Sequence, residues 1–171
     1  MIANTPTYSS MRYNSIASHI LLAAKEDGVK EADDFLLEAL GYSIRSFLTS
    51  RNSRFTIVPV PSSNWATRKR GRDFMMEIAS KLGGAEAIPV QNLLRHNRRI
   101  ADQSGLSAPR RERNVSGAMS VIARAKSPRN VILLDDLVTT GSTLNEAVRA
   151  LRHSGISVLG AITAFLALPI R

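Results

Sequence analysis

Apolar side chains recur at helical spacing in several parts of the chain, and polar segments separate them. The spacing predicts helices over 16–25, over roughly 31–50 and from Phe74 onward. Gly83 and Gly84 follow the third apolar stripe, and glycines in this place are typical of a C-terminal helix cap. The first half of the chain is therefore expected to be mainly helical.

Short apolar runs rich in β-branched residues predict strands at 55–60 and 131–134. A helix over about 143–153, closed by Gly155, and a buried strand over 156–167 follow the second run. A strand, a helix and a strand in this order imply a right-handed crossover in a parallel sheet. The turn after residue 134 then lies at the carboxyl edge of the sheet, where α/β proteins bind ligands.

The segment 95–114 is the least apolar part of the chain and carries six arginines around Gly and Pro, which predicts a mobile basic loop. A short strand is expected within 85–94. The chain has 23 Lys and Arg against 14 Asp and Glu, a formal net charge of +9. Residues 1–50 hold four basic and six acidic side chains, so the basic excess lies after residue 50. This charge favours anionic partners such as phosphate-rich small molecules or nucleic acid.

The 171 residues contain no cysteine, which excludes disulfides, cysteine-ligated zinc or iron–sulfur sites and a cysteine nucleophile. No apolar run reaches the length of about 18 residues that a membrane-spanning helix needs. The polar segment 1–14 lacks the apolar stretch of a secretory signal. We therefore expect a soluble cytoplasmic protein without a membrane partner.

An apolar run, two adjacent carboxylates and a turn rich in Thr, Ser and Gly stand in this order at 131–144. Backbone N–H groups at a helix start, together with hydroxyls, can bind a phosphate. The residues expected to do so are Thr139, Thr140, Gly141, Ser142 and Thr143. Asp135 and Asp136 would repel a phosphate, so we expect them to bind hydroxyl groups of a sugar on the same ligand. Thr143 and Glu146 also have the spacing of a capping box. A ribose 5-phosphate satisfies the whole segment, although each part alone is also typical of a solvated strand-to-helix connection.

This ordered combination resembles the phosphoribosyl pyrophosphate (PRPP) signature of type I phosphoribosyltransferases. From about Phe55 onward, the chain is similar to their ComF branch, competence-associated proteins related to amidophosphoribosyltransferase. The Pro-Val-Pro and basic Arg-Gly patterns of that family are matched by Pro59, Val60, Pro61, Arg68, Arg70 and Gly71. Its later pattern is matched by Gln103, Gly105, Leu106, Ser107, Arg111, Asn114, Val115, Gly117 and Ala118.

The chain departs from the family pattern in places. The usual Arg-Gly-Phe-Asn-Gln is replaced by Arg-Gly-Arg-Asp-Phe over residues 70–74, and Trp65 and Ala66 stand where a basic pair is usual. Many members also carry an N-terminal four-cysteine zinc ribbon, which these 171 residues do not contain.

The resemblance implies an α/β fold of the type I phosphoribosyltransferase kind, with a mainly parallel central sheet flanked by helices. Residues 1–54 would form an N-terminal helical segment or hood, and residues 55–171 the phosphoribosyltransferase core, with both parts in one compact domain. Asp135 and Asp136 would be the catalytic pair that holds the ribose hydroxyls, and Thr139 to Thr143 would hold the 5-phosphate. The implied pyrophosphate-binding residues are Pro61, Ser62, Ser63, Asn64 and Arg70. The implied residues of a flexible loop that closes over the site are Gln103, Arg111 and Asn114.

The resemblance further implies transfer of a phosphoribosyl group from PRPP to an amine or a nucleobase nitrogen, with release of pyrophosphate. Mg²⁺ would bridge the pyrophosphate oxygens, with Asp135 and Asp136 as the protein groups nearest to it. The alternative is a non-catalytic protein that senses PRPP or nucleotides or handles single-stranded DNA during DNA uptake. The low aromatic content of 5% disfavours a pure single-strand binder. The acceptor, a nucleic-acid partner and a homodimer stay open at this point.

Overall fold

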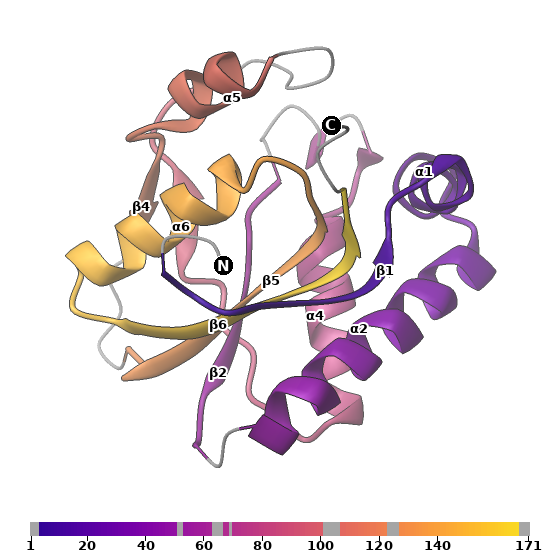
Figure 1. Ribbon diagram of the computed structural model, residues 1–171, viewed down its shortest axis with the longest axis horizontal. Coiled ribbons are helices and arrows are strands. Elements are labelled where there is room, and N and C mark those ends of the chain that lie inside the picture. The colour runs from indigo at the N-terminus through magenta and orange to yellow at the C-terminus, as the bar shows by residue number, and fades with distance from the viewer. Residues whose placement is uncertain are drawn as a thin grey trace.

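The computed structural model of the protein describes residues 4–50, 53–62, 67–68, 70–100, 107–122 and 127–167. Within these ranges a parallel sheet forms the centre of the molecule, with the strand order β1-β6-β5-β2 (Figure 1). Its strands are β1 (Thr7–Arg12), β2 (Thr56–Pro59), β5 (Asn130–Val138) and β6 (Ser157–Leu166). The predicted α/β class with a parallel sheet is therefore confirmed.

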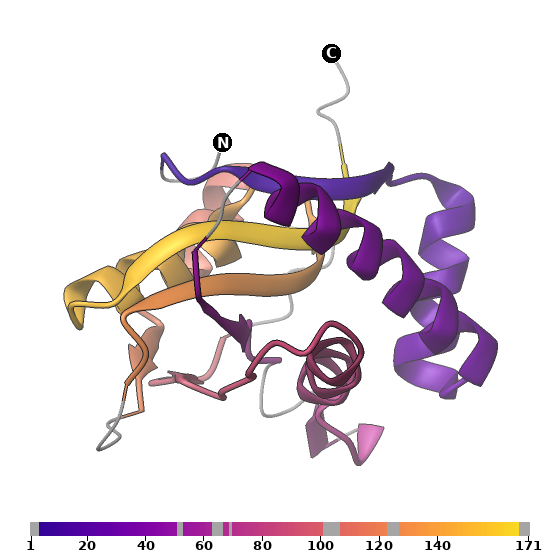
Figure 2. The same ribbon diagram turned by 90° about the horizontal axis from the view of Figure 1, so that it is seen from below.

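Helices cover both faces of this sheet (Figure 2). One face carries α2 (Lys30–Ser50) and α4 (Phe74–Ala85), and the other carries α6 (Ser142–His153). The helix predicted over 16–25 divides into α1 (Ser15–Leu22) and a one-turn π-helix, η1 (Ala23–Asp27). The strand–helix–strand unit predicted near the C-terminus is present as β5, α6 and β6.

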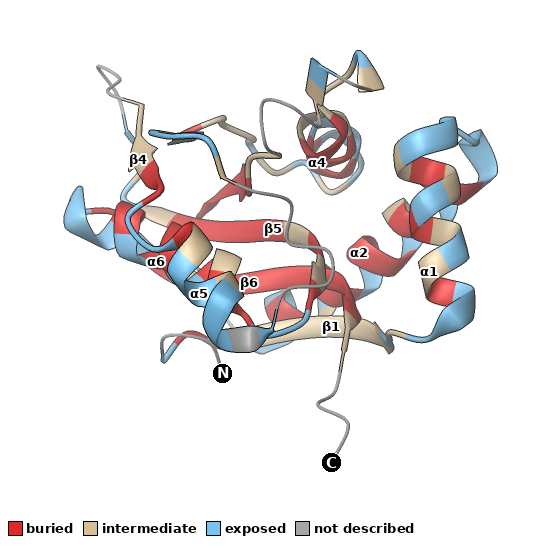
Figure 3. Ribbon diagram, turned by 90° about the horizontal axis from the view of Figure 1, so that it is seen from above, coloured by how far each residue is buried: buried red, intermediate tan, exposed pale blue. Residues whose placement is uncertain are grey.

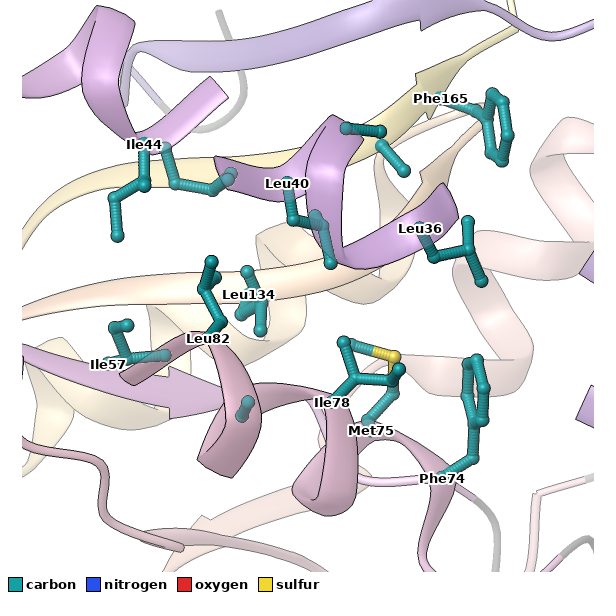
Figure 4. Close-up of a cluster of buried hydrophobic side chains, with 14 of the residues drawn as sticks. Leu36, Leu40, Ile44, Ile57, Phe74, Met75, Ile78, Leu82, Leu134 and Phe165 are labelled. Carbon is teal, nitrogen blue, oxygen red and sulfur yellow. The ribbon is translucent and has the colours of Figure 1, made fainter. Parts of the chain in front are cut away.

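Alternation along the strands creates two separate cores. Ile57, Ile132 and Leu134 point into the core beneath α2 and α4, where Figure 4 shows Ile57 and Leu134 among the side chains of both helices. Val58 and Leu133, their neighbours in sequence, belong to the core beneath α6. Because successive side chains of a strand point to opposite faces, strands buried on both faces must be apolar at nearly every position. Figure 3 shows β5 and β6 as largely buried, in agreement with the continuous apolar runs of the sequence.

The strand predicted at 131–134 is longer in the structure and contains both aspartates. Asp135 pairs with Thr163 of β6, and Val138 still pairs with Leu166. The prediction that a polar turn begins at residue 135 was therefore wrong. The reason is that β6 extends far enough to supply partners along the whole of β5, and a continuing parallel ladder satisfies the backbone of this segment.

The predicted glycine cap of the third helix was also wrong, since α4 continues through Gly83 and Gly84 to Ala85. Gly83 serves a different purpose. A Cβ atom at this position would lie 2.3 Å from Val90 Cγ2 and 2.7 Å from the carbonyl oxygen of Ile88. The missing side chain lets the segment with Val90, which forms a parallel bridge to Ile57, pass close to the helix.

The segment predicted as a basic loop over 95–114 contains regular structure. Strand β3 (Leu94–His96) pairs antiparallel with β4 (Met119–Val121), and helix α5 (Ala108–Val115) lies between them in sequence. Pro109 suits the first turn of a helix, and Arg98 donates hydrogen bonds to carbonyl groups at the helix end. Apolar periodicity could not reveal α5, because this helix is largely exposed (Figure 3). Residues 101–106 lie outside the described residues.

The polar N-terminal segment forms β1, which adds to the edge of the sheet beside β6. Tyr8 packs edge-on against Phe47 of α2, with 5.5 Å between ring centroids, and Ser9 shares a hydrogen bond with Thr163. The boundary near residue 54 stays a prediction, although β1 is part of the central sheet. Among the described residues, no helix combines the length and the apolar character needed to span a membrane.

Candidate functional site

The phosphate turn, residues 139–143, connects the carboxyl end of β5 to the start of α6. Gly141 adopts the left-handed conformation, with φ 77°, and precedes the first helical residue. The Thr140 and Ser142 hydroxyl groups lie 2.8 Å apart. An open pocket at this place is lined by Asp135, Leu137, Val138, Thr139, Thr140, Gly141, Ser142, Thr143 and Leu144. The structure thus brings together the five residues predicted to bind the 5-phosphate.

The predicted capping box between Thr143 and Glu146 was wrong, because the N-cap of α6 is Gly141. The buried carboxylate of Glu146 accepts hydrogen bonds from the Met119 N–H, over 2.9 Å, and from Arg149. Burial by itself would raise the pKa of Glu146, but the hydrogen bonds from Arg149 and Met119 outweigh it and lower the pKa. Glu146 therefore joins α6 to β4 rather than capping its own helix.

The acidic pair lies on β5 just before the phosphate turn. Asp136 is buried and forms an ion pair with Lys25 of η1. Asp135 is half-buried, and its Oδ1 accepts a hydrogen bond from the Asp136 N–H over 3.0 Å. Burial and the neighbouring carboxylate of Asp136 raise the pKa of Asp135 well above its ordinary value, against the opposing effect of Lys25.

Lys25 was not singled out in the sequence. It lies on an amphipathic helical segment about 110 positions before the aspartates, and no local pattern distinguishes it from a solvated lysine. Its Nζ also lies 5.8 Å from the centroid of the Phe74 ring. Only the tertiary fold places this cation beside the acidic pair.

The predicted pyrophosphate-binding residues follow β2. Val60 comes directly after this strand, and its N–H donates to the Leu134 carbonyl group, which keeps the following Pro61 and Ser62 beside β5. The carbonyl oxygen of Pro61 lies 3.0 Å from His96 Nε2. Ser63 and Asn64 lie outside the described residues.

Arg70 is the charged member of this group. Its side chain is only 8% exposed, and its Nη1 lies 3.4 Å from Glu26 Oε1 of η1. Its Nε is buried and has no hydrogen-bond partner within the described part of the chain. A buried guanidinium with an unsatisfied donor and only a long contact to its carboxylate is suited to bind an anionic ligand.

Arg72 explains the departure from the usual family pattern at this point of the sequence. Its guanidinium donates to Asp33 of α2 over 3.2 Å, to Glu77 of α4 over 3.0 Å, and to the Ala24 carbonyl group of η1. It also lies 5.1 Å from the Phe74 ring centroid. The hydrogen bond to Asp33 is the main cause of its raised pKa. Arg72 therefore joins three helical elements and is not directed at a ligand.

The predicted flexible-loop residues have different places in the structure. Arg111 of α5 donates a hydrogen bond from Nη1 to Thr139 Oγ1 over 3.3 Å, so it reaches the phosphate turn. Asn114 lies on the same helix, where its backbone carbonyl accepts from Arg98. Gln103 lies outside the described residues.

A resident metal cage is absent from the described part of the chain, where no group of three or more His, Asp or Glu side chains could hold an ion. The site offers two carboxylates, Asp135 and Asp136. Mg²⁺ prefers oxygen ligands and commonly takes most of them from substrate phosphates and water. The donor set thus fits an Mg²⁺ ion delivered with a phosphorylated ligand.

Comparison with known proteins identifies the family of the chain. A family model described as the phosphoribosyl transferase domain matches residues 43–168, which is more than half of the chain. The chain belongs to this family. The chain is also 35% identical over 103 residues to "Competence protein F" of Haemophilus influenzae. That alignment covers 58% of this chain and 45% of the relative, and it supports the expected similarity to the ComF branch.

Solved structures of phosphoribosyltransferases are similar to this chain at low sequence identity. A crystal structure of adenine phosphoribosyltransferase has 14% identity and a TM-score of 0.48, and the match covers 76% of this chain and 66% of that one. The orotate phosphoribosyltransferase of Aeropyrum pernix has 12% identity and a TM-score of 0.47, and the match covers 81% of this chain and 73% of that one.

Proposed function

We propose that the protein binds PRPP at the carboxyl end of β5 and transfers its phosphoribosyl group to an amine or a nucleobase nitrogen, with release of pyrophosphate. The observation that carries this proposal is the convergence of three segments, far apart in sequence, on one end of the sheet. They are residues 135–143, which contain the acidic pair and the phosphate turn, the Arg70 segment, and Arg111 of α5. Arg111 contacts Thr139, and the neighbouring η1 residues Lys25 and Glu26 contact Asp136 and Arg70.

The 5-phosphate binds at the phosphate turn in this proposal. Backbone N–H groups at the start of α6 are unsatisfied within the helix and carry partial positive charge. The hydroxyl groups of Thr139 and Thr140 add donors, and Arg111 supplies a full positive charge at Thr139. Guanidinium pairs well with phosphate oxygens, so Arg111 exchanges its contact to Thr139 for one to the ligand.

The ribose lies over the acidic pair. Asp135 and Asp136 accept hydrogen bonds from its hydroxyl groups, and their negative charge faces a ring that becomes cationic as the bond from C1 to pyrophosphate breaks. The electron pair of that bond leaves with pyrophosphate, and the acceptor nitrogen forms the new bond to C1 and loses a proton. Catalysis of this kind depends mainly on positioning and on charges fixed before the reaction.

The leaving pyrophosphate gains negative charge in this step. Arg70 and the backbone after Pro61 are the groups of this chain that we assign to it. Asp135 and Asp136 are the residues that would lie nearest an Mg²⁺ ion brought by the ligand, and such an ion would offset part of that charge.

The acceptor is limited by one property of the sequence. Because none of the 171 residues is a cysteine, a cysteine-dependent release of ammonia from glutamine does not come from these residues. The nitrogen nucleophile is therefore free ammonia, an amine or a base.

A second candidate function is binding of single-stranded nucleic acid. It is favoured by exposed Arg110 and Arg113, which flank Arg111 on α5. Binding of this kind weakens steeply with salt, by roughly one logarithmic unit per logarithmic unit of salt for each neutralised phosphate.

Calorimetric titration of PRPP with Mg²⁺ into the wild type and an Asp135→Asn/Asp136→Asn double variant tests the proposal. Asp34→Asn, at an exposed position of α2, is the control for loss of an acidic charge. We expect binding to the wild type and the control that depends on Mg²⁺ and is lost in the double variant. Absence of PRPP binding in the wild type, with salt-sensitive binding of an oligonucleotide, would instead support the second function.

A further inference from the structure

Two consecutive side chains of η1 pair with two residues that the proposed function assigns to the ligand. Lys25 forms its ion pair with Asp136, and Glu26 faces Arg70 over 3.4 Å. A cation thus stands at the carboxylate that would hold ribose, and a carboxylate stands at the arginine that would hold pyrophosphate. We call residues 23–28 the strap.

The strap is anchored independently of these two contacts. Arg72 donates to the Ala24 carbonyl group, and the Val29 N–H donates to the Ala23 carbonyl group over 3.0 Å. Gly28 ends the π-turn in the left-handed conformation, with φ 65°. The backbone of the strap is therefore fixed, while Lys25 and Glu26 extend from it into the site.

The five-residue turn sets the direction of these side chains. A π-helix is rare, appears mostly as a single turn and is frequent at functional sites. Its wider turn changes the direction of the following side chains relative to an α-helix. Here the turn follows directly on α1, whose remaining face is largely exposed. The neighbouring side chains of Lys25 and Glu26, which have opposite charges, then meet Asp136 and Arg70, which also have opposite charges.

We propose that the strap is an autoinhibitory contact, in which Lys25 and Glu26 occupy the ribose and pyrophosphate positions until a ligand that carries both groups replaces them. This inference rests on the proposed function. A pyrophosphate group cannot share Arg70 with Glu26 without repulsion between two anions, and ribose hydroxyl groups must compete with Lys25 for Asp136. A ligand that carries both ribose and pyrophosphate breaks both strap contacts, and it replaces both with its own contacts to Asp136 and Arg70. A ligand with only one of these groups replaces only one contact.

The Glu26 contact is tested by calorimetry with Mg²⁺–PRPP, Mg²⁺–pyrophosphate and ribose 5-phosphate as separate probes. Glu26→Gln removes the competing charge and should bind Mg²⁺–PRPP and Mg²⁺–pyrophosphate roughly two- to fivefold more tightly than the wild type, as expected for a partly exposed ion pair. Binding of ribose 5-phosphate should change less than about twofold. Asp27→Asn, the same loss of charge one residue further on at an exposed position, is the matched control and should change each affinity less than about twofold.

The Lys25 contact is tested by chemical labelling of lysine amines, followed by mass spectrometry. The Lys25 side chain is 29% exposed and paired in the free protein, so it should react slowly. Saturating Mg²⁺–PRPP should increase its labelling severalfold, while the labelling of exposed Lys30 stays constant. Decreased labelling of Lys25 in the complex would overturn its role as a competitor, because it would mean that the ligand covers Lys25.

The two proposals fail in different ways. Equal Mg²⁺–PRPP affinity in the wild type and Glu26→Gln overturns the strap and leaves the proposed function intact. Absence of PRPP binding in the wild type and in every variant overturns both. Binding that is detected only after Glu26→Gln supports both, since the contact then masks the site in the wild type.

Discussion

Arg111 of α5 donates a hydrogen bond to the side chain of Thr139, 28 positions further along the chain, over 3.3 Å. This contact brings the one arginine of α5 that is not fully exposed to the turn that precedes α6. The same helix presents Arg110 and Arg113 to solvent. The arginine that we propose as a phosphate ligand and its matched controls thus occur within four residues.

Arg111→Ala should weaken binding of Mg²⁺–PRPP about tenfold or more, because a charge-assisted hydrogen bond to phosphate contributes roughly 1.5–3 kcal/mol. Calorimetry measures this change, with Arg110→Ala as the control for loss of charge on the same helix. Equal effects of the two substitutions would mean that Arg111 acts only through the general field of α5.

Gly83→Ala should destabilise the fold by about 1–3 kcal/mol, since its Cβ would lie 2.3 Å from Val90 Cγ2 and 2.7 Å from a backbone oxygen. Gly84→Ala is the control, because a Cβ there has no atom within 4 Å, and alanine is the better helix former by about 0.5–1 kcal/mol. Urea unfolding followed by circular dichroism should move the two midpoints in opposite directions. A stabilised Gly83→Ala variant would contradict the close approach of α4 to residues 88–90.

Arg72→Gln should lower the free energy of unfolding by roughly 2 kcal/mol. Breaking a buried pair costs about 3–5 kcal/mol, and the 23% exposure of the Arg72 side chain reduces this. The main loss arises at Asp33, which is 5% exposed and would lose its guanidinium partner. Arg12→Gln, at an exposed position at the end of β1, is the control in the same urea experiment. An unchanged unfolding midpoint for Arg72→Gln would show that the three helical elements hold together without it.

Asp135 should make stability depend on pH. Because its folded pKa is raised above that of the unfolded chain, the carboxyl group favours the folded state at low pH, and this contribution is lost as the pH rises through the folded pKa. Asp135→Asn removes the titration. Relative to the wild type, this variant should therefore gain stability as the pH rises above about 4, the ordinary range of an aspartate in the unfolded chain, as measured by urea unfolding at several pH values. A constant difference above this pH would contradict the raised pKa.

The sequence allowed much of the sheet to be predicted, because the continuous apolar runs of β5 and β6 are what burial on both faces requires. β1 escaped prediction, since an edge strand with polar residues such as Ser9 and Thr7 has no such run. Helix α5 escaped for a related reason: it buries too little to show an apolar period. The two glycines of α4 were misinterpreted, because the contact that requires Gly83 is tertiary.

The local part of the candidate site followed from the sequence in the same way. Residues 135–143 are contiguous, so their order was enough to predict one phosphate and sugar site, and their roles stay predictions. The partners of that segment could not be found locally. Lys25 and Arg111 reach this segment only through folding. The departure from the family pattern at Arg72 is explained by its ion pair with Asp33, which is a tertiary contact.

The contacts of Met119 have a consequence for the ribbon formed by β3 and β4. Its N–H donates to Glu146, and its carbonyl group accepts from Arg149 over 3.0 Å, so two side chains of α6 bind both polar groups of one peptide-chain residue. A neighbouring strand would use the same donor and acceptor. Glu146 and Arg149 therefore take the place of a neighbouring strand at this position, and the ribbon ends at α6. At Met119 the main chain keeps no free N–H or carbonyl group to which another polypeptide could pair and so extend the ribbon.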